Sequence, residues 1–328
     1  MTAFDETPNR EEVFMKPHAM TRRQLAASVA GFAASAMLGV GKTKADDEVP
    51  FSAGTEKPKF RAPEHTCDCH FHIYNSKFPA APNASLVPPD ASLADYKRLR
   101  ERLGFERSVI VQPSTYGTDN SCLLEALAEL GGSARGVAVV DTSVTDAELK
   151  RLDGLGVRGI RFNLGRAGAT SVDMIAPLSK RVADLGWHIQ VHMKGDDIAK
   201  NADLLGSLPV IVVFDHLGRI PQPDALDHPA FKVVRDLLAT GKAYAKISSL
   251  YQDTLDGPPY ADVGAVAKAD LLAAPDQLIW GSDWPHPSPG KHGKPDDAQL
   301  MDLAAAWAGD EPTIRKVFVE NPTKLYGF

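Results

Sequence analysis

The chain has 328 residues, of which 44% are hydrophobic and 24% are charged, and its formal net charge is −6. This is the composition of a soluble globular protein, and the length suits one α/β barrel or two smaller domains. Because the globular part contains no run of lysines and arginines, nucleic acid is not an expected partner. The three cysteines are too few for a disulfide scaffold.

Residues 1–45 are predicted to be an export signal rather than part of the fold. The pair Arg22-Arg23 precedes a weakly apolar run over residues 25–40, and a small-residue cleavage site ends at Ala45. The paired arginines indicate the twin-arginine route and a periplasmic location. The apolar run is too short and too rich in alanine for a membrane span. A disordered tail on a cytoplasmic protein is the alternative.

A short linker, residues 46–65, is predicted to lead into the first strand, Thr66–His72, with the sequence TCDCHFH. Because side chains alternate along a strand, Asp68, His70 and His72 are expected on one face. The other face is expected to hold reduced thiols packed behind the barrel wall, those of Cys67 and Cys69. Two imidazoles facing one cavity can bind a metal ion or polarise a carbonyl. A pair of hydrogen-bonded core histidines is the alternative.

Short apolar runs then alternate with helical patterns along the chain. Further strands are predicted at residues 108–112, 136–140, 157–162, 188–192, 210–214, 244–247 and 278–280. Helices are predicted at residues 93–103, 120–130, 145–155, 171–185, 196–205, 229–239, 261–273, 296–307 and 313–319. Eight βα units with parallel strands close into a (β/α)8 TIM barrel, a single domain over residues 66–328. The doubly wound open sheet is disfavoured because no glycine-rich phosphate turn follows the first strand.

Polar side chains gather where the predicted strands end, which is where barrels of this kind carry their active sites. Those positions hold His70, His72, Ser114, Arg161, Asn163, Arg166, His192, Asp215, His216, Arg219, Tyr251, Asp283 and His286. Some of them have simpler explanations, since Asp215-His216 can cap a helix and Asp283 can cap a turn. The barrel topology nevertheless predicts that these side chains converge on one mouth.

Five segments in this order, DCHFH, HMKG, FDHLGR, WGSDWPH and ENPTKLYGF, resemble the amidohydrolase superfamily, and within it the lactone-hydrolysing branch. The resemblance covers about residues 60–328. It implies that Asp283 is the general base, acting with His192 and His216. It also implies substrate contacts from Arg161, Arg166, Arg219 and Ser114. Position at the barrel mouth adds Tyr251 and His286 to the predicted substrate contacts.

One divalent ion, Zn²⁺ or Mn²⁺, is predicted to bind through three imidazoles and one carboxylate, those of His70, His72, His192 and Asp283. Members of the superfamily with two metal ions place a lysine or glutamate at the end of strand four. Here Arg161 and Asn163 stand there, so a bridged metal pair is not expected. Some relatives keep similar histidines without metal, so a metal-free site is the alternative.

The predicted reaction is hydrolysis of a lactone that carries carboxylate or sulfonate groups, such as a muconolactone or a pyrone dicarboxylate. Asp283 would take a proton from water, and arginines would hold the anionic groups. A sugar-acid lactonase, a lactone isomerase and a non-catalytic periplasmic binding barrel are the alternatives. The expected partner is therefore a small anionic lactone, without nucleic acid or a stable membrane span, and a homo-oligomer is left open.

Overall fold

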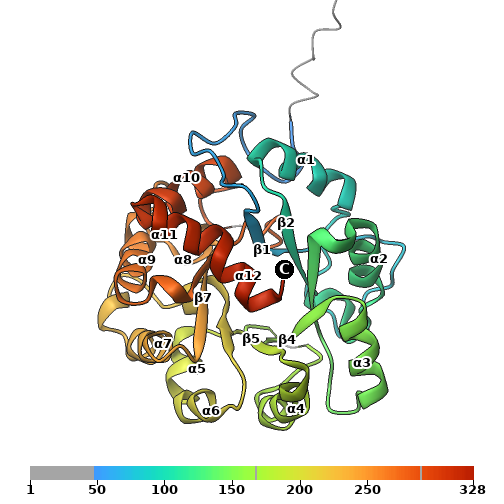
Figure 1. Ribbon diagram of the computed structural model, residues 1–328. Helices are drawn as coiled ribbons and strands as arrows, with labels where there is room; N and C mark the ends of the chain where they lie inside the picture. Colours follow the sequence, from blue (N-terminus) through green and yellow to red (C-terminus); the bar gives the residue numbers. More distant parts are fainter. Residues whose placement is uncertain (1–47, 167, 289) are drawn as a thin grey trace, which may run out of the picture. The chain divides into compact units, whose positions relative to one another are not determined.

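Eight parallel strands form a ring surrounded by helices in the computed structural model, which describes residues 48–166, 168–288 and 290–328 (Figure 1). Their order in the sheet follows the chain: β1 (Cys67–Phe71), β2 (Arg107–Val111), β3 (Ala134–Ala138), β4 (Val157–Asn163), β5 (His188–His192), β6 (Val212–Phe214), β7 (Ala243–Ile247) and β8 (Leu278–Trp280). The chain after β8 closes the ring on β1, because Asp283 N donates to His70 O at 2.7 Å. The predicted barrel is confirmed, whereas the predicted export signal lies outside the described residues.

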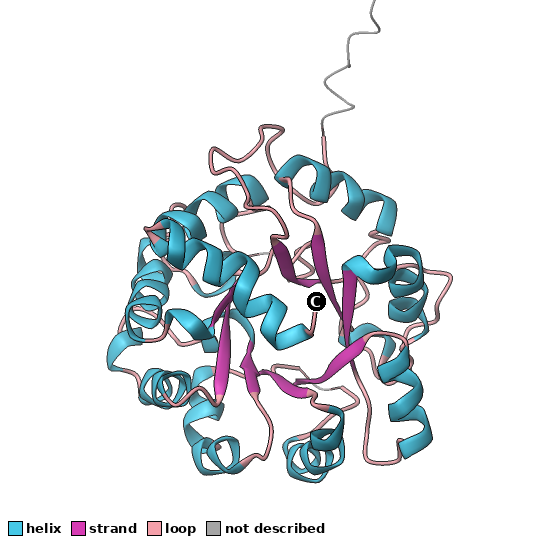
Figure 2. Ribbon diagram, in the orientation of Figure 1, coloured by secondary structure: helices cyan, strands magenta, loops and turns pink. Residues whose placement is uncertain are grey.

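Most of the helices surround the ring of strands (Figure 2). The helices are α1 (Leu93–Leu103), α2 (Ser121–Leu130), α3 (Asp146–Gly154), α4 (Ile175–Val182), α5 (Gly195–Lys200), α6 (Ala202–Ser207), α7 (Pro229–Ala239), α8 (Leu250–Asp253), α9 (Ala261–Ala273), α10 (Asp297–Ala308), α11 (Glu311–Arg315) and α12 (Asn321–Tyr326). The last of these, α12, lies across one end of the ring beside the C-terminus (Figure 1). Among the described residues, no helix has the length and apolar character that crossing a membrane requires.

Polar side chains explain two differences from the predicted elements. The helix predicted over residues 196–205 is broken at Asn201, whose Nδ2 donates to Asp197 O at 2.8 Å. Such side-chain bonds to the backbone compete with helix continuation. The third strand ends at Ala138 rather than at residue 140, because the side chain of Asn120 binds both N and O of Val139.

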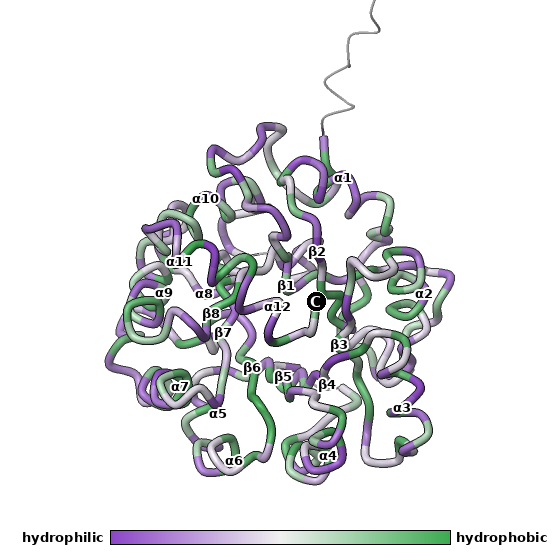
Figure 3. Tube along the Cα trace, viewed as in Figure 1, coloured by the Kyte–Doolittle hydropathy of each residue, from purple (hydrophilic) through white to green (hydrophobic). Residues whose placement is uncertain are grey.

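Two apolar layers hold the barrel together. Between strands and helices, residues such as Ile160 and Phe162 of β4 pack against the buried faces of the helices. Inside the ring, a smaller cluster joins alternate strand residues with Tyr326 of α12. Figure 3 shows hydrophobic and hydrophilic residues mixed along the surrounding helices, as expected for helices with one face on the barrel.

The face assignment predicted for the first strand is wrong for three residues. Cys67 and Cys69 are free thiols that pack inside the barrel, and Asp68 points outward to accept from Tyr96 of α1 at 3.0 Å. The pairing of β1 with β2 shifts register between Asp68 and Phe71, which is a β-bulge. An extra residue in a strand reverses the alternation beyond it. His70 therefore points inward as predicted, although the cysteines do so too.

The segment predicted to be a linker packs on the barrel from residue 48 onward. Val49 and Ser52 are buried, and Trp284 Nε1 donates to Pro50 O at 2.8 Å. The hydroxyl of Ser52 accepts from Arg102 of α1 at 2.6 Å. Residues 48–53 are therefore part of the folded unit.

Candidate active site

A pocket opens at the carboxyl ends of the strands. Its lining residues are His72, Tyr74, Leu86, Pro113, Ser114, Arg161, Asn163, Arg166, His192, His216, Gln252, Asp283, Pro287 and Ser288. Seven of the eleven residues predicted to act in catalysis, substrate binding or metal binding line it, and an eighth, His70, lies against His72 and Asp283. The convergence predicted from chain order is thus present in the fold.

One oxygen of Asp283 is surrounded by imidazole nitrogens. Its Oδ1 lies 3.5 Å from His70 Nε2, 3.7 Å from His72 Nε2 and 3.9 Å from His216 Nε2. The two nitrogens of His70 and His72 are 3.3 Å apart. The donor atoms of His70, His72 and Asp283 are close enough to hold a metal ion together.

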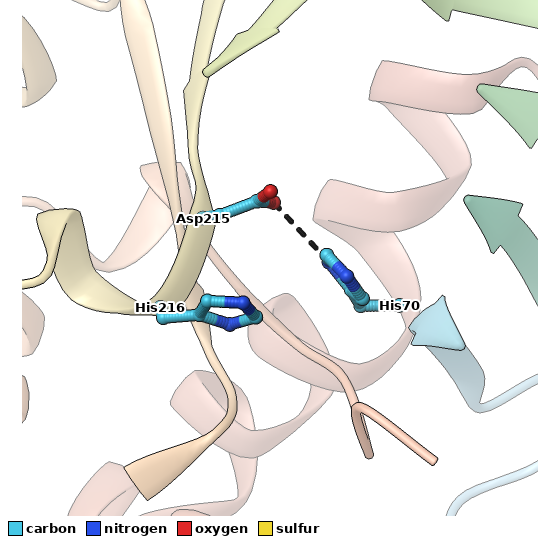
Figure 4. A group of neighbouring side chains, drawn as sticks. All are labelled: His70, Asp215 and His216. Carbon is cyan, nitrogen blue, oxygen red and sulfur yellow. Dashed lines mark ion pairs between the residues drawn. The ribbon is translucent and has the colours of Figure 1, made fainter. Parts of the chain in front are cut away.

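The far ring nitrogen of each imidazole is held by a neighbour. His72 Nδ1 donates to Val111 O at 2.7 Å, which leaves a lone pair on its Nε2. His70 Nδ1 lies 3.2 Å from Asp215 Oδ1, and Figure 4 marks this contact with a dashed line and shows His216 beside it. Asp215 favours a proton on Nδ1 of His70, which leaves the lone pair on Nε2 facing Asp283, whereas Lys246 Nζ, 3.2 Å from the same Nδ1, favours the opposite tautomer. Contacts of this kind fix the tautomer of metal-binding and catalytic histidines.

Burial keeps these imidazoles neutral. Burial and the neighbouring Arg161 lower the pKa of His72 to about 3. Burial also lowers the pKa of His70, His192 and His216 well below the usual value. For Asp283 burial acts in the opposite direction and raises the pKa of the carboxyl group, against the hydrogen bond from Tyr251. Neutral imidazoles are the form that binds metal ions.

Two charged residues beneath the pocket have no catalytic role in the sequence-based prediction. Asp215 accepts from Arg161 Nε at 3.0 Å, and Lys246 Nζ lies 3.7 Å from its other oxygen. Burial opposes ionisation of Asp215, but His70, Arg161 and Lys246 outweigh it and hold its pKa well below the usual value. Burial lowers the pKa of Lys246 to about 8. The available signal was a lysine inside the otherwise apolar strand AYAKI.

The three predicted arginines are held in different ways. Arg161 is buried and uses Nε for Asp215, while its guanidinium lines the pocket. Arg166 is exposed at the mouth, where its Nη2 donates to Ser288 Oγ at 2.8 Å. Arg219 does not line the pocket. It binds both oxygens of Asp253, at distances from 2.7 to 3.1 Å.

His192 lies apart from the group that the structure brings together for a metal ion. Its Nε2 is 3.2 Å from Arg219 Nη1, so the nitrogen faces a cation. Arg219 reaches this place because the turn after β6 runs through left-handed backbone, with φ 55° at His216 and 48° at Arg219. Of the four predicted metal ligands, His70, His72 and Asp283 are therefore adjacent, and His192 is not.

The remaining predicted contacts divide between the pocket and the layer behind it. Ser114 lines the pocket, where Asn163 Nδ2 lies 3.4 Å from its hydroxyl. Tyr251 donates to Asp283 Oδ2 at 2.6 Å, and His286 Nδ1 lies 3.2 Å from the Tyr251 hydroxyl. Both are buried and neither lines the pocket. Gln252, which the prediction omits, does line the pocket and lies 3.3 Å from Asp283 Oδ2.

Comparison with known proteins identifies the family. The amidohydrolase family model matches residues 67–328. This chain belongs to the amidohydrolase family.

Two relatives are similar over most of their length. A 2-pyrone-4,6-dicarboxylate hydrolase from Comamonas testosteroni is 35% identical, and the match covers 84% of this chain and 94% of that protein. A 4-sulfomuconolactone hydrolase from Rhizobium radiobacter is 33% identical, with 82% and 92% covered. A solved apo structure of an Agrobacterium tumefaciens protein is 29% identical with a TM-score of 0.79, covering 85% of this chain and 98% of that one. The chain is therefore an enzyme, and the two named relatives are hydrolases of a pyrone dicarboxylate and a sulfomuconolactone.

Proposed function

We propose that this amidohydrolase opens the ring of a lactone that carries carboxylate or sulfonate groups. The observation that carries the proposal is the shared pocket of Asp283, Arg161 and Arg166. The pocket thus contains a buried carboxylate that can accept and donate a proton, and two guanidinium groups that can bind an anionic substituent. The names of the two relatives, which act on a pyrone dicarboxylate and a sulfomuconolactone, support the same substrate class.

Asp283 is suited to move a proton in both directions. Its Oδ1 lies beside the imidazoles of His72 and His216, which line the pocket, while Oδ2 is held by Tyr251. As water attacks the lactone carbonyl, Oδ1 accepts a proton from it. The same proton then passes to the ring oxygen as the acyl C–O bond breaks. A carboxyl pKa raised by burial brings base and acid forms closer in energy, which favours such an exchange.

The residues around Asp283 fit one divalent ion. With Nδ1 of His72 donating to Val111 and Nδ1 of His70 facing Asp215, both Nε2 lone pairs point toward Asp283 Oδ1. Three acceptors in contact repel one another unless a proton or a cation lies between them. His70, His72 and Asp283 would hold Zn²⁺ or Mn²⁺, and the ion would supply Lewis-acid polarisation of a carbonyl.

The arginines would fix the ring relative to Asp283. Arg161 presents the free part of a guanidinium whose Nε is already anchored on Asp215. Anchoring one nitrogen reduces the side-chain entropy that substrate binding must remove. Arg166 approaches from the mouth and would meet a second anionic group of the substrate. Two anchors on one ring select its orientation as well as its charge.

The test is a panel of acidic and neutral lactones incubated with the purified protein, with products identified by mass. We expect ring-opened hydroxy or oxo acids, heavier than the substrate by one water, from acidic lactones alone. Products of unchanged mass would show an isomerase, and equal turnover of neutral lactones would remove the role of the arginines. Elemental analysis should find at most one divalent ion per chain. Full activity after exhaustive chelation would contradict the metal site.

A further inference from the structure

A row of buried side chains runs behind Asp283, away from the pocket. Tyr251 Oη lies 2.6 Å from Asp283 Oδ2, His286 Nδ1 lies 3.2 Å from Tyr251 Oη, and Asp297 Oδ2 lies 3.0 Å from His286 Nε2. All four side chains are buried, and only Asp283 lines the pocket. The row passes from Asp283 in the loop after β8 to α8, returns to that loop at His286 and ends at the first residue of α10.

The directions of these hydrogen bonds follow from the number of protons available. Asp283 Oδ2 accepts the single hydroxyl proton of Tyr251, so the tyrosine oxygen is free to accept from His286 Nδ1. His286 then carries a proton on Nε2 as well, which it donates to Asp297 Oδ2. Every contact in the row is thereby satisfied, and each bond polarises the next.

We infer that Tyr251, His286 and Asp297 are positioning residues that hold the carboxylate of Asp283 for catalysis. This inference rests on the proposed function, in which Oδ1 must face the pocket. The carboxylate of Asp283 can rotate about its Cβ–Cγ bond, and the Tyr251 hydroxyl at 2.6 Å holds Oδ2, with a longer contact from Gln252 Nε2 at 3.3 Å. His286 fixes the direction of that hydroxyl, and Asp297 fixes the imidazole. Asp297 thus affects the reaction through His286 and Tyr251, without touching the substrate.

The decisive experiment compares the single variants Tyr251→Phe and Asp297→Asn with the double variant on a lactone that the wild type hydrolyses. Removing partners behind a catalytic group costs about 10–100-fold, so we expect kcat to fall about that much for each single variant. KM should stay unchanged because neither side chain lines the pocket. The double variant should be no slower than Tyr251→Phe, because breaking the row at Tyr251 already disconnects Asp297. An unchanged kcat in Asp297→Asn, or two effects that multiply, would overturn the inference.

Two controls separate this inference from damage to the fold and from the proposed function. Asp270→Asn, which alters a buried carboxyl group on α9 away from the site, should leave kcat unchanged. Nuclear magnetic resonance of ¹⁵N-histidine protein should show two hydrogen-bonded imidazole N–H signals that vanish in His286→Gln. One should shift in Tyr251→Phe and the other in Asp297→Asn. If no lactone is hydrolysed, the proposed function fails, but these signals still test whether His286 bonds to both Tyr251 and Asp297. A single N–H signal from His286 would refute the row of hydrogen bonds.

Discussion

At the scale of single residues, whether an arginine near the barrel mouth can bind a substrate anion depends on its neighbours. Arg166 and Arg219 are both predicted substrate contacts. Arg166 is exposed at the pocket and has one hydroxyl partner. Arg219 donates to the carboxylate of Asp253 from both Nε and Nη2. A guanidinium already satisfied by an aspartate has little to offer a substrate anion, because binding would require breaking the existing pair. We therefore expect the two positions to behave differently.

Replacing Arg166 by methionine should raise KM for an acidic lactone about tenfold and leave the free energy of unfolding unchanged. The charge-assisted bond to the substrate is lost, and such bonds contribute on the order of 1.5 kcal/mol or more. The matched variant Arg219→Met should instead lower the free energy of unfolding by roughly 1–3 kcal/mol, because Asp253 loses its partner. Steady-state kinetics and urea denaturation of both variants make the comparison. A larger KM effect from Arg219→Met than from Arg166→Met would reverse these assignments.

At the scale of elements, the first strand shows what the sequence can and cannot specify. The order of apolar runs was sufficient to predict the barrel and the strand-end histidines, because eight βα units have few ways to close. The bulge between Asp68 and Phe71 was not predictable, since period-two alternation carries no signal for one extra residue. Likewise, the location of Arg219 depends on backbone conformations after β6 rather than on residue type.

The closure of the barrel at β1 depends on a glycine. A Cβ on Gly281 would lie 2.7 Å from His70 Cβ and 2.9 Å from His70 N. Gly281→Ala should therefore lower the free energy of unfolding by about 1–3 kcal/mol, the usual cost of overpacking, and should reduce activity by displacing His70. Gly132→Ala is the control, because a Cβ there meets nothing within 4 Å. Equal denaturation midpoints for the two variants would show that the close contact between Gly281 and His70 does not limit the stability of the barrel.

Helix α9 contains a buried carboxyl group with no hydrogen-bond partner among the described residues, that of Asp270. Burial raises its pKa to about 7, although Arg235 acts in the opposite direction. The unfolded chain loses this proton near pH 4, so this carboxyl group reduces the stability of the fold as pH rises from about 4 to 7.

Asp270→Asn removes that titration. At about 1.4 kcal/mol for each pKa unit, the variant should gain roughly 2–4 kcal/mol over the wild type between pH 4 and pH 8. Urea denaturation at the two pH values measures the difference. Parallel curves for the two proteins would mean that the carboxyl group is solvated or paired in solution.

At the scale of the whole molecule, we propose that the protein works in the periplasm. The arginine pair Arg22-Arg23 before a weakly apolar run supports export of an already folded chain. A barrel with three free thiols and no disulfide among the described residues suits that route. Mass spectrometry of fractionated cells should find a mature chain cut near Ala45. A full-length chain confined to the cytoplasm would contradict the proposal.

The central claim is that Asp283 activates water for attack on a lactone carbonyl, and one measurement addresses it directly. The wild type and Asp283→Asn are compared on an acidic lactone in ¹⁸O-labelled water, with product mass and kcat recorded. The amide is nearly the same size but cannot take the proton, and general acid–base catalysis contributes about 10²–10⁴-fold. We predict one ¹⁸O atom in the new carboxylate of the wild-type product and a loss of kcat in that range for the variant. A variant with near-normal kcat, or a wild-type product without the label, would contradict the claim.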